Sequence, residues 1–278
     1  MHYDYRFPGF RMKALTFSYD DGVVQDRRLL EILAKHDLHG TFNLNGGLFP
    51  AEEGKRGRMS RASVAALYNA PGVEVAMHGY THTHLEVQDT PRVLYEIMAD
   101  KQSLEDLFGH PISGFAYPFG TYADHVVTAL RTAGVRYART VTSTGRFDMP
   151  QDWLRMPATC HHNDPRLFEL ADRFLALADN EARRDRVPLS LFYLWGHSYE
   201  FDDNDNWQVI EQFAAKMSGQ ADIWYATNGE ICNYTRAIAA LEITADGRHC
   251  YNPTVTPVCF YAGGQPYTAL PGETITIG

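Results

Sequence analysis

Short hydrophobic runs alternate with longer amphipathic segments over most of the chain, from Lys13 to about Leu241. Runs of this length, separated by segments of a different periodicity, are typical of buried strands. We expect strands at Ala14–Ser18, Thr41–Leu44, Val73–Met77, Gly114–Tyr117, Arg136–Arg139, Leu189–Trp195 and Ile223–Tyr225.

The segments between the runs carry hydrophobic residues at intervals near 3.6, which predicts helices with one buried face. Three such sets are Leu29, Leu30, Leu33 and Ala34 after Gly22, Val93, Ile97, Leu104 and Leu107 before Gly109, and Val126, Val127, Leu130 and Ala133 before Gly134. Because strand and helix alternate six or seven times, the strands should be parallel and covered by helices. Periodicity alone permits both an open sheet and a closed barrel.

Two segments interrupt the alternation. Thr144–Pro165 contains three prolines and few regular signals, so we expect a long loop over one end of the sheet. Arg248–Gly278 has short β-like runs separated by turn dipeptides, which predicts a small antiparallel appendage. We therefore divide the chain into an α/β domain, residues 1–245, and a C-terminal β-hairpin appendage, residues 246–278, packed on it.

Composition excludes several classes of protein. With 45% hydrophobic residues the chain can bury a large core, and its net charge of −9 argues against nucleic acid or an anionic membrane as the main partner. The four cysteines form no CxxC pair, which argues against a disulfide framework and favours a reducing compartment. Because no export signal or membrane-length hydrophobic run is present, we expect a cytoplasmic protein. The oligomeric state stays open.

Acidic and histidine side chains follow several predicted strands. Asp20, Asp21 and Gly22 end the first strand, at the edge where active sites form in α/β folds, although Asp-Gly is also ordinary turn chemistry. His78 and His82 follow the third strand at a spacing that one helical turn would bring together. This is the spacing of a two-histidine metal site that needs a third ligand, with a polar surface loop as the alternative.

Two further histidines complete this pattern. His84 could replace His78 or His82 after a change of register, so it ranks below them. His197 ends a later strand, and a histidine alone in such a place is more often structural. Polar residues at three equivalent strand ends indicate a site that no single cluster would establish.

Four motifs in this order resemble the NodB-type polysaccharide deacetylases, carbohydrate esterase family 4. The family's TFDDG motif is similar to Thr16–Gly22, and its histidine motif is similar to His78–His82. Phe115–Gly120 resembles the third, RPPYG-like motif, and Leu191–His197 resembles the last, a strand that ends in histidine. The resemblance spans roughly Leu15 to Tyr225.

The resemblance implies a distorted (β/α)7-type barrel that removes an acetyl group from a carbohydrate with the help of one divalent metal. It makes Asp21, His78 and His82 the metal ligands, Asp20 the general base and His197 the general acid. The backbone N–H of Phe119 would stabilise the oxyanion. This ligand set suits zinc first, with nickel or cobalt as alternatives.

The sequence also departs from the family. Ala116 stands where family members often carry an arginine that pairs with a later aspartate. Asp152-Trp153 resembles the fourth motif, and Arg139 or Arg155 could supply the cationic partner of Asp152. We expect substrate contacts from Tyr80, Tyr117, Trp153, Trp195, Arg139 and Asp152, because sugar faces stack on aromatic rings.

Two other polar clusters have plainer explanations. Cys160–Asp164 lies in the proline-bounded segment, so we favour loop structure or substrate contact over a second metal site there. Asp202–Asp205 lacks the ligand spacing of a calcium loop, and a solvated loop or a helix cap explains it.

The function expected from the sequence is therefore hydrolysis of a C–N bond other than a peptide bond, as a deacetylase acting on an acetylated saccharide. Two alternatives stay open. Similar barrels include allantoinase-like hydrolases of cyclic amides, which need no such metal site. A sugar-binding pseudoenzyme is the other, although it would have no use for base, acid and metal ligands together.

Overall fold

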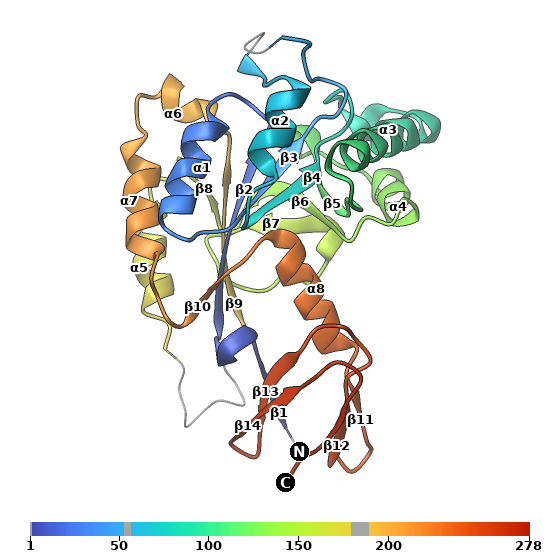
Figure 1. Cartoon of the computed structure of the whole chain (residues 1–278), viewed down its shortest axis with the longest axis vertical. Coiled ribbons are helices and arrows are strands. Elements are labelled where there is room, and N and C mark those ends of the chain that lie inside the picture. The colour runs from blue at the N-terminus through green and yellow to red at the C-terminus, as the bar shows by residue number, and fades with distance from the viewer. Residues whose placement is uncertain (1, 53–56, 179–188) are drawn as a thin grey trace.

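The computed structural model describes residues 2–52, 57–178 and 189–278, and its main element is a parallel sheet of nine strands (Figure 1). The strands are β2 (Lys13–Asp20), β3 (Gly40–Leu44), β4 (Val73–Met77), β5 (Gly114–Ala116), β6 (Tyr137–Ser143), β7 (Met156–Ala158), β8 (Cys160–His161), β9 (Ser190–Gly196) and β10 (Ile223–Tyr225). Their order is β7-β6-β5-β4-β3-β2-β9-β8, and β10 pairs with the first residues of β2. All seven predicted strands are present within a few residues of their expected ends.

The sheet closes into a distorted barrel through residues 156–161. β7 pairs with β6 at one end of the strand order, and β8, which follows one residue later, pairs with β9 at the other end. Between them, the Thr159 amide donates to the Tyr193 carbonyl, 2.9 Å away. The predicted barrel is confirmed, and the loop expected over 144–165 is interrupted by these two short strands. Pro157 and the shortness of both strands hid them, because proline within a run argues against a strand.

Helices cover the outside of the barrel. They are α1 (Asp26–Lys35), α2 (Arg61–Tyr68), α3 (Thr90–Phe108), α4 (Asp124–Thr132), α5 (Leu167–Leu175), α6 (Tyr199–Asp203), α7 (Gln208–Met217) and α8 (Asn228–Ala239). Short 3₁₀ turns lie at η1 (Pro8–Phe10), η3 (Leu85–Val87), η4 (Pro118–Gly120) and η5 (Trp153–Arg155). Leu15 and Phe17 of β2 pack with Leu29 and Leu33 of α1 in the largest hydrophobic core. Within the described residues, no helix combines the length and hydrophobicity of a membrane span.

Residues at the helix ends determine where two of these helices begin and stop. Asp89 accepts a hydrogen bond from the Arg92 amide at the start of α3, and Gly109, with φ of +73°, ends it. Thr227 and Glu230 form a reciprocal capping box at the start of α8. In Figure 1, α8 lies between the barrel and the antiparallel sheets of the lower part.

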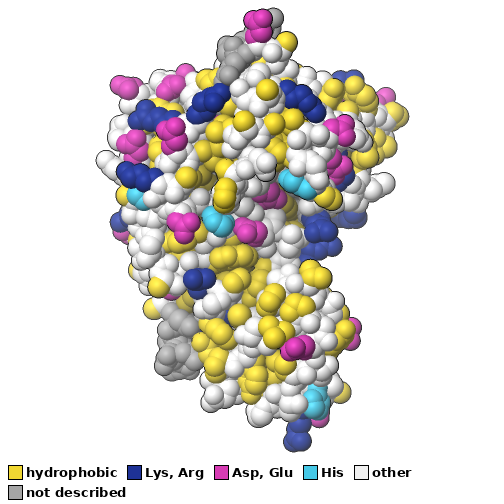
Figure 2. All heavy atoms as spheres, viewed as in Figure 1, with side chains coloured by type: hydrophobic (Ala, Val, Ile, Leu, Met, Phe, Trp, Pro, Cys, Tyr) yellow, Lys and Arg dark blue, Asp and Glu magenta, His cyan; other side chains and the backbone are white. Residues whose placement is uncertain are grey.

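Two three-stranded antiparallel sheets form the appendage. One contains β1 (Tyr3–Arg6), β13 (Val258–Ala262) and β14 (Gln265–Ala269), and the other contains β11 (Glu242–Ile243), β12 (His249–Tyr251) and β15 (Thr274–Thr276). The antiparallel pairing agrees with the sequence, but the appendage is larger than a hairpin. It includes β1, which pairs with β13 from the opposite end of the chain, so both termini lie in this lower part (Figure 1). On the face shown in Figure 2, hydrophobic side chains gather over the appendage.

Candidate active site

Asp20, the last residue of β2, is a buried carboxylate with partners from two other strands. Asn43 Nδ2 of β3 donates to its Oδ1 at 2.8 Å, and the Arg139 guanidinium of β6 donates to its Oδ2. Burial alone raises the pKa of Asp20, but the charges of Arg139, His78 and His197 outweigh it and lower the pKa to about 2. The carboxylate is therefore ionised at neutral pH.

Asp21 turns away from the strand because its backbone leaves the extended conformation. Its φ is +85°, and its amide donates to the Asn43 carbonyl at 3.0 Å. Arg58 donates to Asp21 Oδ1 at 2.9 Å and also to the Asp21 backbone carbonyl, so one arginine fixes both the side chain and the backbone of Asp21. Such a positive φ is costly for a residue other than glycine, and its occurrence at a strand end is typical of a functional site.

His78 follows β4 and is buried. Its Nδ1 lies 2.9 Å from the Ala116 carbonyl, which can only accept, so Nδ1 carries the proton and Nε2 is the unprotonated nitrogen of the neutral ring. Its amide donates to Asp100 Oδ2 at 3.0 Å, which ties the loop to α3. A second partner on the far ring nitrogen is what orients histidine ligands in metal sites.

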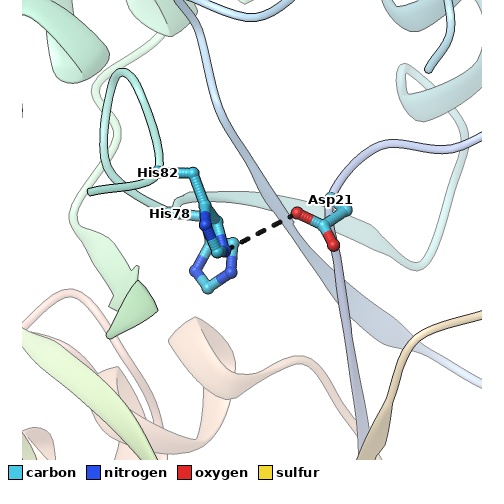
Figure 3. A group of neighbouring side chains, drawn as sticks. All are labelled: Asp21, His78 and His82. Atoms are coloured by element: carbon cyan, nitrogen blue, oxygen red, sulfur yellow. Dashed lines mark ion pairs between the residues drawn. The ribbon is translucent and has the colours of Figure 1, made fainter. Parts of the chain in front are cut away.

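His82 reaches the same place through a tight turn, not through the helical turn expected from the sequence. Gly79 and His82 have φ of +78° and +51°, and the His78 and His82 ring centroids are 4.8 Å apart. His82 Nε2 faces Asp21 Oδ1 at 3.9 Å, as Figure 3 shows. Burial and the neighbouring His78 lower the pKa of His82 to about 4.

The three predicted ligands thus converge. One ligand atom each from Asp21, His78 and His82 lie within 4.8 Å of one another, with the carboxylate facing the two imidazoles (Figure 3). Two imidazoles and one carboxylate fit a divalent cation and leave further coordination positions open. His84 lies outside this group, and its ring stacks on that of Phe119 with the ring centroids 3.8 Å apart.

His197 follows β9 and lies close to Asp20. Its Nε2 lies 3.8 Å from Asp20 Oδ2, and its Nδ1 lies 2.9 Å from Glu200 Oε1. Burial alone lowers the pKa of His197, but the hydrogen bond that it donates to Glu200 and the charges of Asp20 and Asp21 raise it overall. The surrounding carboxylates therefore stabilise the imidazolium form of His197 relative to a free histidine.

One cavity of about 520 Å³ is lined by the two carboxylates and the three histidines, namely Asp20, Asp21, His78, His82 and His197. Its aromatic lining comes from Tyr117, Phe119, Trp195 and Tyr199. Phe119 has φ of +59°, which makes it the third non-glycine residue of the site with a left-handed backbone, after Asp21 and His82. A cavity lined by both ionisable and aromatic side chains is suited to a ligand that has both hydroxyl groups and apolar faces.

The predicted substrate contacts divide between the cavity and its surroundings. Tyr117 and Trp195 line it, whereas Tyr80, Trp153, Asp152 and Arg139 are not among its lining residues. Tyr80 packs on Tyr95, with ring centroids 5.9 Å apart, and Trp153 packs against the second hydrophobic core. Their roles in substrate binding stay predictions.

The partner of Asp152 is Arg155 and not Arg139. Arg155 donates to Asp152 Oδ2 at 2.6 Å, whereas Arg139 is committed to Asp20. Arg139 is also the register partner of Ala116 on the adjacent strand, the position at which the family often has arginine. The positive charge beside Asp20 therefore comes from the next strand of the sheet.

Sequence reasoning missed several residues that hold the site. Asn43, Arg58 and Asp100 support Asp20, Asp21 and His78 respectively, and Glu200 holds His197. Asn43 follows Phe42 in β3, and a polar residue inside a buried strand was the available signal. Arg58 and Asp100 have no such local pattern.

The two other polar clusters of the sequence, Cys160–Asp164 and Asp202–Asp205, both lie partly in regular secondary structure. Residues 160–161 form β8, and His161 and His162 face Glu200, so this segment is part of the barrel and not a loop. Asp202 accepts a hydrogen bond from Trp207 Nε1 at 2.7 Å and joins α6 to α7. Asp202 and Asp203 therefore lie in a helix and not in the expected solvated loop, and no side chain caps the start of α7.

Comparisons with known proteins find similarity to polysaccharide deacetylases. Residues 9–138 match the family model described as polysaccharide deacetylase. A structure from Mycobacterium smegmatis assigned to the polysaccharide deacetylases is 19% identical, with a TM-score of 0.59 over 84% of this chain and 93% of that one. The search of curated proteins found no match.

Two more distant structures are also similar. A family 4 carbohydrate esterase from Streptomyces lividans, in complex with acetate, is 17% identical over 73% of this chain and 88% of that one, with a TM-score of 0.47. A CE4 family pseudoenzyme from Bacillus anthracis is 19% identical over 82% and 68%, with a TM-score of 0.49.

Proposed function

We propose that this chain, whose residues 9–138 match the polysaccharide deacetylase family model, removes an acetyl group from a carbohydrate or saccharide conjugate. An N-acetyl group is the preferred target. The observation that carries the proposal is the convergence of a buried carboxylate, a His-His-Asp group and a second histidine on one cavity. A protein that only binds sugars would not need all three together.

Asp21, His78 and His82 would hold one divalent cation, with zinc as the first choice and nickel or cobalt as alternatives. A cation there would act as a Lewis acid that polarises the acetyl carbonyl and lowers the pKa of the attacking water. The low pKa of Asp20 agrees with this requirement, because so weak a base accepts a proton only from a water that is itself acidified.

The chain's own residues supply the remaining steps. Asp20 accepts the proton of the attacking water, and His197, on the opposite side of Asp20, donates a proton to the leaving amine or alcohol. The Phe119 backbone N–H, at the cavity wall, would donate to the oxyanion. Tyr117 and Trp195 would contact the sugar or the acetyl methyl group.

We propose a soluble saccharide or conjugate as the substrate and the cytoplasm as its location, as expected from the sequence. The cavity of about 520 Å³ has room for a small sugar unit. The oligomeric state is left open.

Two variants test the proposal by separating metal binding from proton transfer. We expect His78→Ala to lose the metal and acetate release together. Asp20→Asn should keep the metal and lose about 100-fold or more in kcat. His110→Ala is a matched control, because His110 is an exposed histidine beyond the end of α3. The measurements are metal content by plasma emission and acetate release from N-acetylated saccharides.

Two outcomes of these measurements would count against acetyl-group hydrolysis. A purified protein without a stoichiometric divalent ion, in which His78→Ala changes nothing, would contradict the proposal. Hydrolysis of a cyclic amide without release of acetate would point to the allantoinase-like alternative instead.

A further inference from the structure

A carboxylate outside the predicted site holds the proposed general acid. Glu200 lies in the first turn of α6, three residues after His197, and its Oε1 is 2.9 Å from His197 Nδ1. The other ring nitrogen, Nε2, faces Asp20 and the cavity. One ring nitrogen is therefore held by the protein, and the other is presented to the substrate.

We infer that Glu200 is the positioning residue of His197, and that its carboxylate holds the imidazole in the orientation and protonated form that a general acid needs. The inference rests on the proposed function, since it assigns a partner to that acid. An imidazole that donates through Nδ1 to a carboxylate has a defined ring orientation, and the negative charge favours the imidazolium.

The second oxygen of Glu200 is held in turn by the segment that closes the barrel. His161 Nε2 and His162 Nε2 lie 3.2 and 2.8 Å from Oε2, and Asn163 Nδ2 donates to it at 3.0 Å. The Asn163 amide also donates to His161 Nδ1 at 3.1 Å. Because that nitrogen accepts, the proton of neutral His161 lies on Nε2, which faces the carboxylate.

These contacts keep Glu200 ionised and in place. Burial by itself raises the pKa of Glu200, but His162 and His197 outweigh it and hold the pKa well below its usual range. Burial lowers the pKa of His161 to about 4 and also lowers that of His162, so both rings are neutral at pH 7. Glu200 therefore carries the single full charge among these three side chains.

A second metal site is the competing explanation for the cluster. Ligand atoms of His161, His197 and Glu200 lie within 4.8 Å of one another. However, His161 and His197 face different oxygens of the same carboxylate at hydrogen-bond distances, and the His161 proton lies on the nitrogen that would have to bind the metal. Hydrogen bonds from His197 and Asn163 to Glu200 therefore explain the cluster without a metal, and the variant Glu200→Gln separates the two explanations.

The test compares two leaving groups in the variant Glu200→Gln. An amine from an N-acetyl saccharide must be protonated as it leaves, whereas 4-nitrophenolate from 4-nitrophenyl acetate leaves without a proton. We expect kcat on the N-acetyl saccharide to fall about 100-fold with KM little changed. Hydrolysis of 4-nitrophenyl acetate should stay within about threefold of the wild type, since it needs no general acid. Asp203→Asn, at an exposed carboxylate of the same helix, is the matched control.

The pH profile gives a second readout. The charged or titratable groups around His197 are Glu200, Asp20 and Asp21, with His161, Tyr199 and Arg139 further away. A general acid is active below its own pKa, and removing the Glu200 charge lowers the pKa of His197. The basic limb of the kcat profile should therefore move to lower pH in Glu200→Gln. In Glu200→Asp, which keeps the negative charge, the limb should lie closer to its position in the wild type.

Three results would overturn the inference. They are an equal loss on both substrates, a second equivalent of metal in the wild type that Glu200→Gln loses, and an unchanged His197 pKa in proton NMR titration. The titration needs no activity, so it tests the contact separately. A wild type that releases acetate from neither substrate would instead contradict the proposed function.

Discussion

At the scale of single residues, the Arg139–Asp20 ion pair is the feature that most constrains the site. The two side chains are only 1% and 3% exposed, and the guanidinium lies 4.6 Å from the centre of the Trp195 ring. Nε and Nη1 of Arg139 have no hydrogen-bond partner within the described residues. Arg139 therefore serves chiefly to compensate the buried charge of Asp20. Burying either charge without the other would lower the free energy of unfolding.

We expect Arg139→Met to lower the free energy of unfolding by about 3–5 kcal/mol, because it leaves the Asp20 carboxylate buried without its partner. The variant should also lose kcat, since Asp20 is no longer held in place. Urea denaturation and acetate release measure the two effects.

The exposed Arg155–Asp152 pair provides the control for this substitution. Arg155→Met should change stability far less, because water screens that pair. The double variant Asp20→Asn/Arg139→Met should recover part of the lost stability, since it buries no uncompensated carboxylate. Equal losses in Arg139→Met and Arg155→Met would contradict this explanation.

At the scale of elements, barrel closure depends on residues 156–161. The Thr159 hydroxyl accepts from the Tyr193 amide of β9 and donates to the Arg146 carbonyl, both at 3.0 Å. One threonine thus joins the two ends of the strand order. The same segment continues into His161 and His162, so barrel closure also brings these two rings to Glu200.

We expect Thr159→Val to destabilise the fold by about 1–3 kcal/mol, because the buried Tyr193 amide loses its acceptor while the volume is conserved. Urea denaturation measures the loss. Thr128→Val removes a hydroxyl that bonds to an exposed helix carbonyl and should stay within about 0.5 kcal/mol of the wild type. Equal stability of the two variants would show that this bond does not hold the barrel closed.

At the scale of the whole molecule, the appendage is attached to the barrel through α8. The Tyr234 hydroxyl donates to the Arg6 carbonyl of β1 at 2.6 Å and accepts from the Cys259 amide of β13 at 3.0 Å. Both partners belong to the appendage sheet that combines the two ends of the chain. Appendage and barrel therefore share one buried polar contact.

We expect Tyr234→Phe to lower the free energy of unfolding by about 1–3 kcal/mol, because a buried amide and a buried carbonyl lose their partner. The kcat of acetate release should be unchanged, since Tyr234 is not among the residues that line the candidate active-site cavity. Tyr267→Phe, whose hydroxyl bonds to the exposed Gly278 amide, is the control. Urea denaturation measures the loss of stability, and a parallel assay of acetate release measures kcat. A loss of kcat in Tyr234→Phe would contradict this prediction, because it would link the appendage to catalysis.

The sequence by itself determined the parallel α/β class, seven strands and the residues at their ends. These features depend on local periodicity and on neighbours in sequence, so Asp20, Asp21, His78, His82 and His197 could be singled out together. It could not show whether the sheet closes, because closure depends on two short strands that carry no periodic signal of their own.

Only the tertiary structure decided which side chains support the catalytic candidates. Arg139 is 119 residues from Asp20 and meets it because their strands face one barrel interior. β1 likewise joins β13 from the opposite end of the chain. Such contacts depend on strand order and register across the whole fold, and hydrophobic periodicity does not encode which distant charged side chains become neighbours.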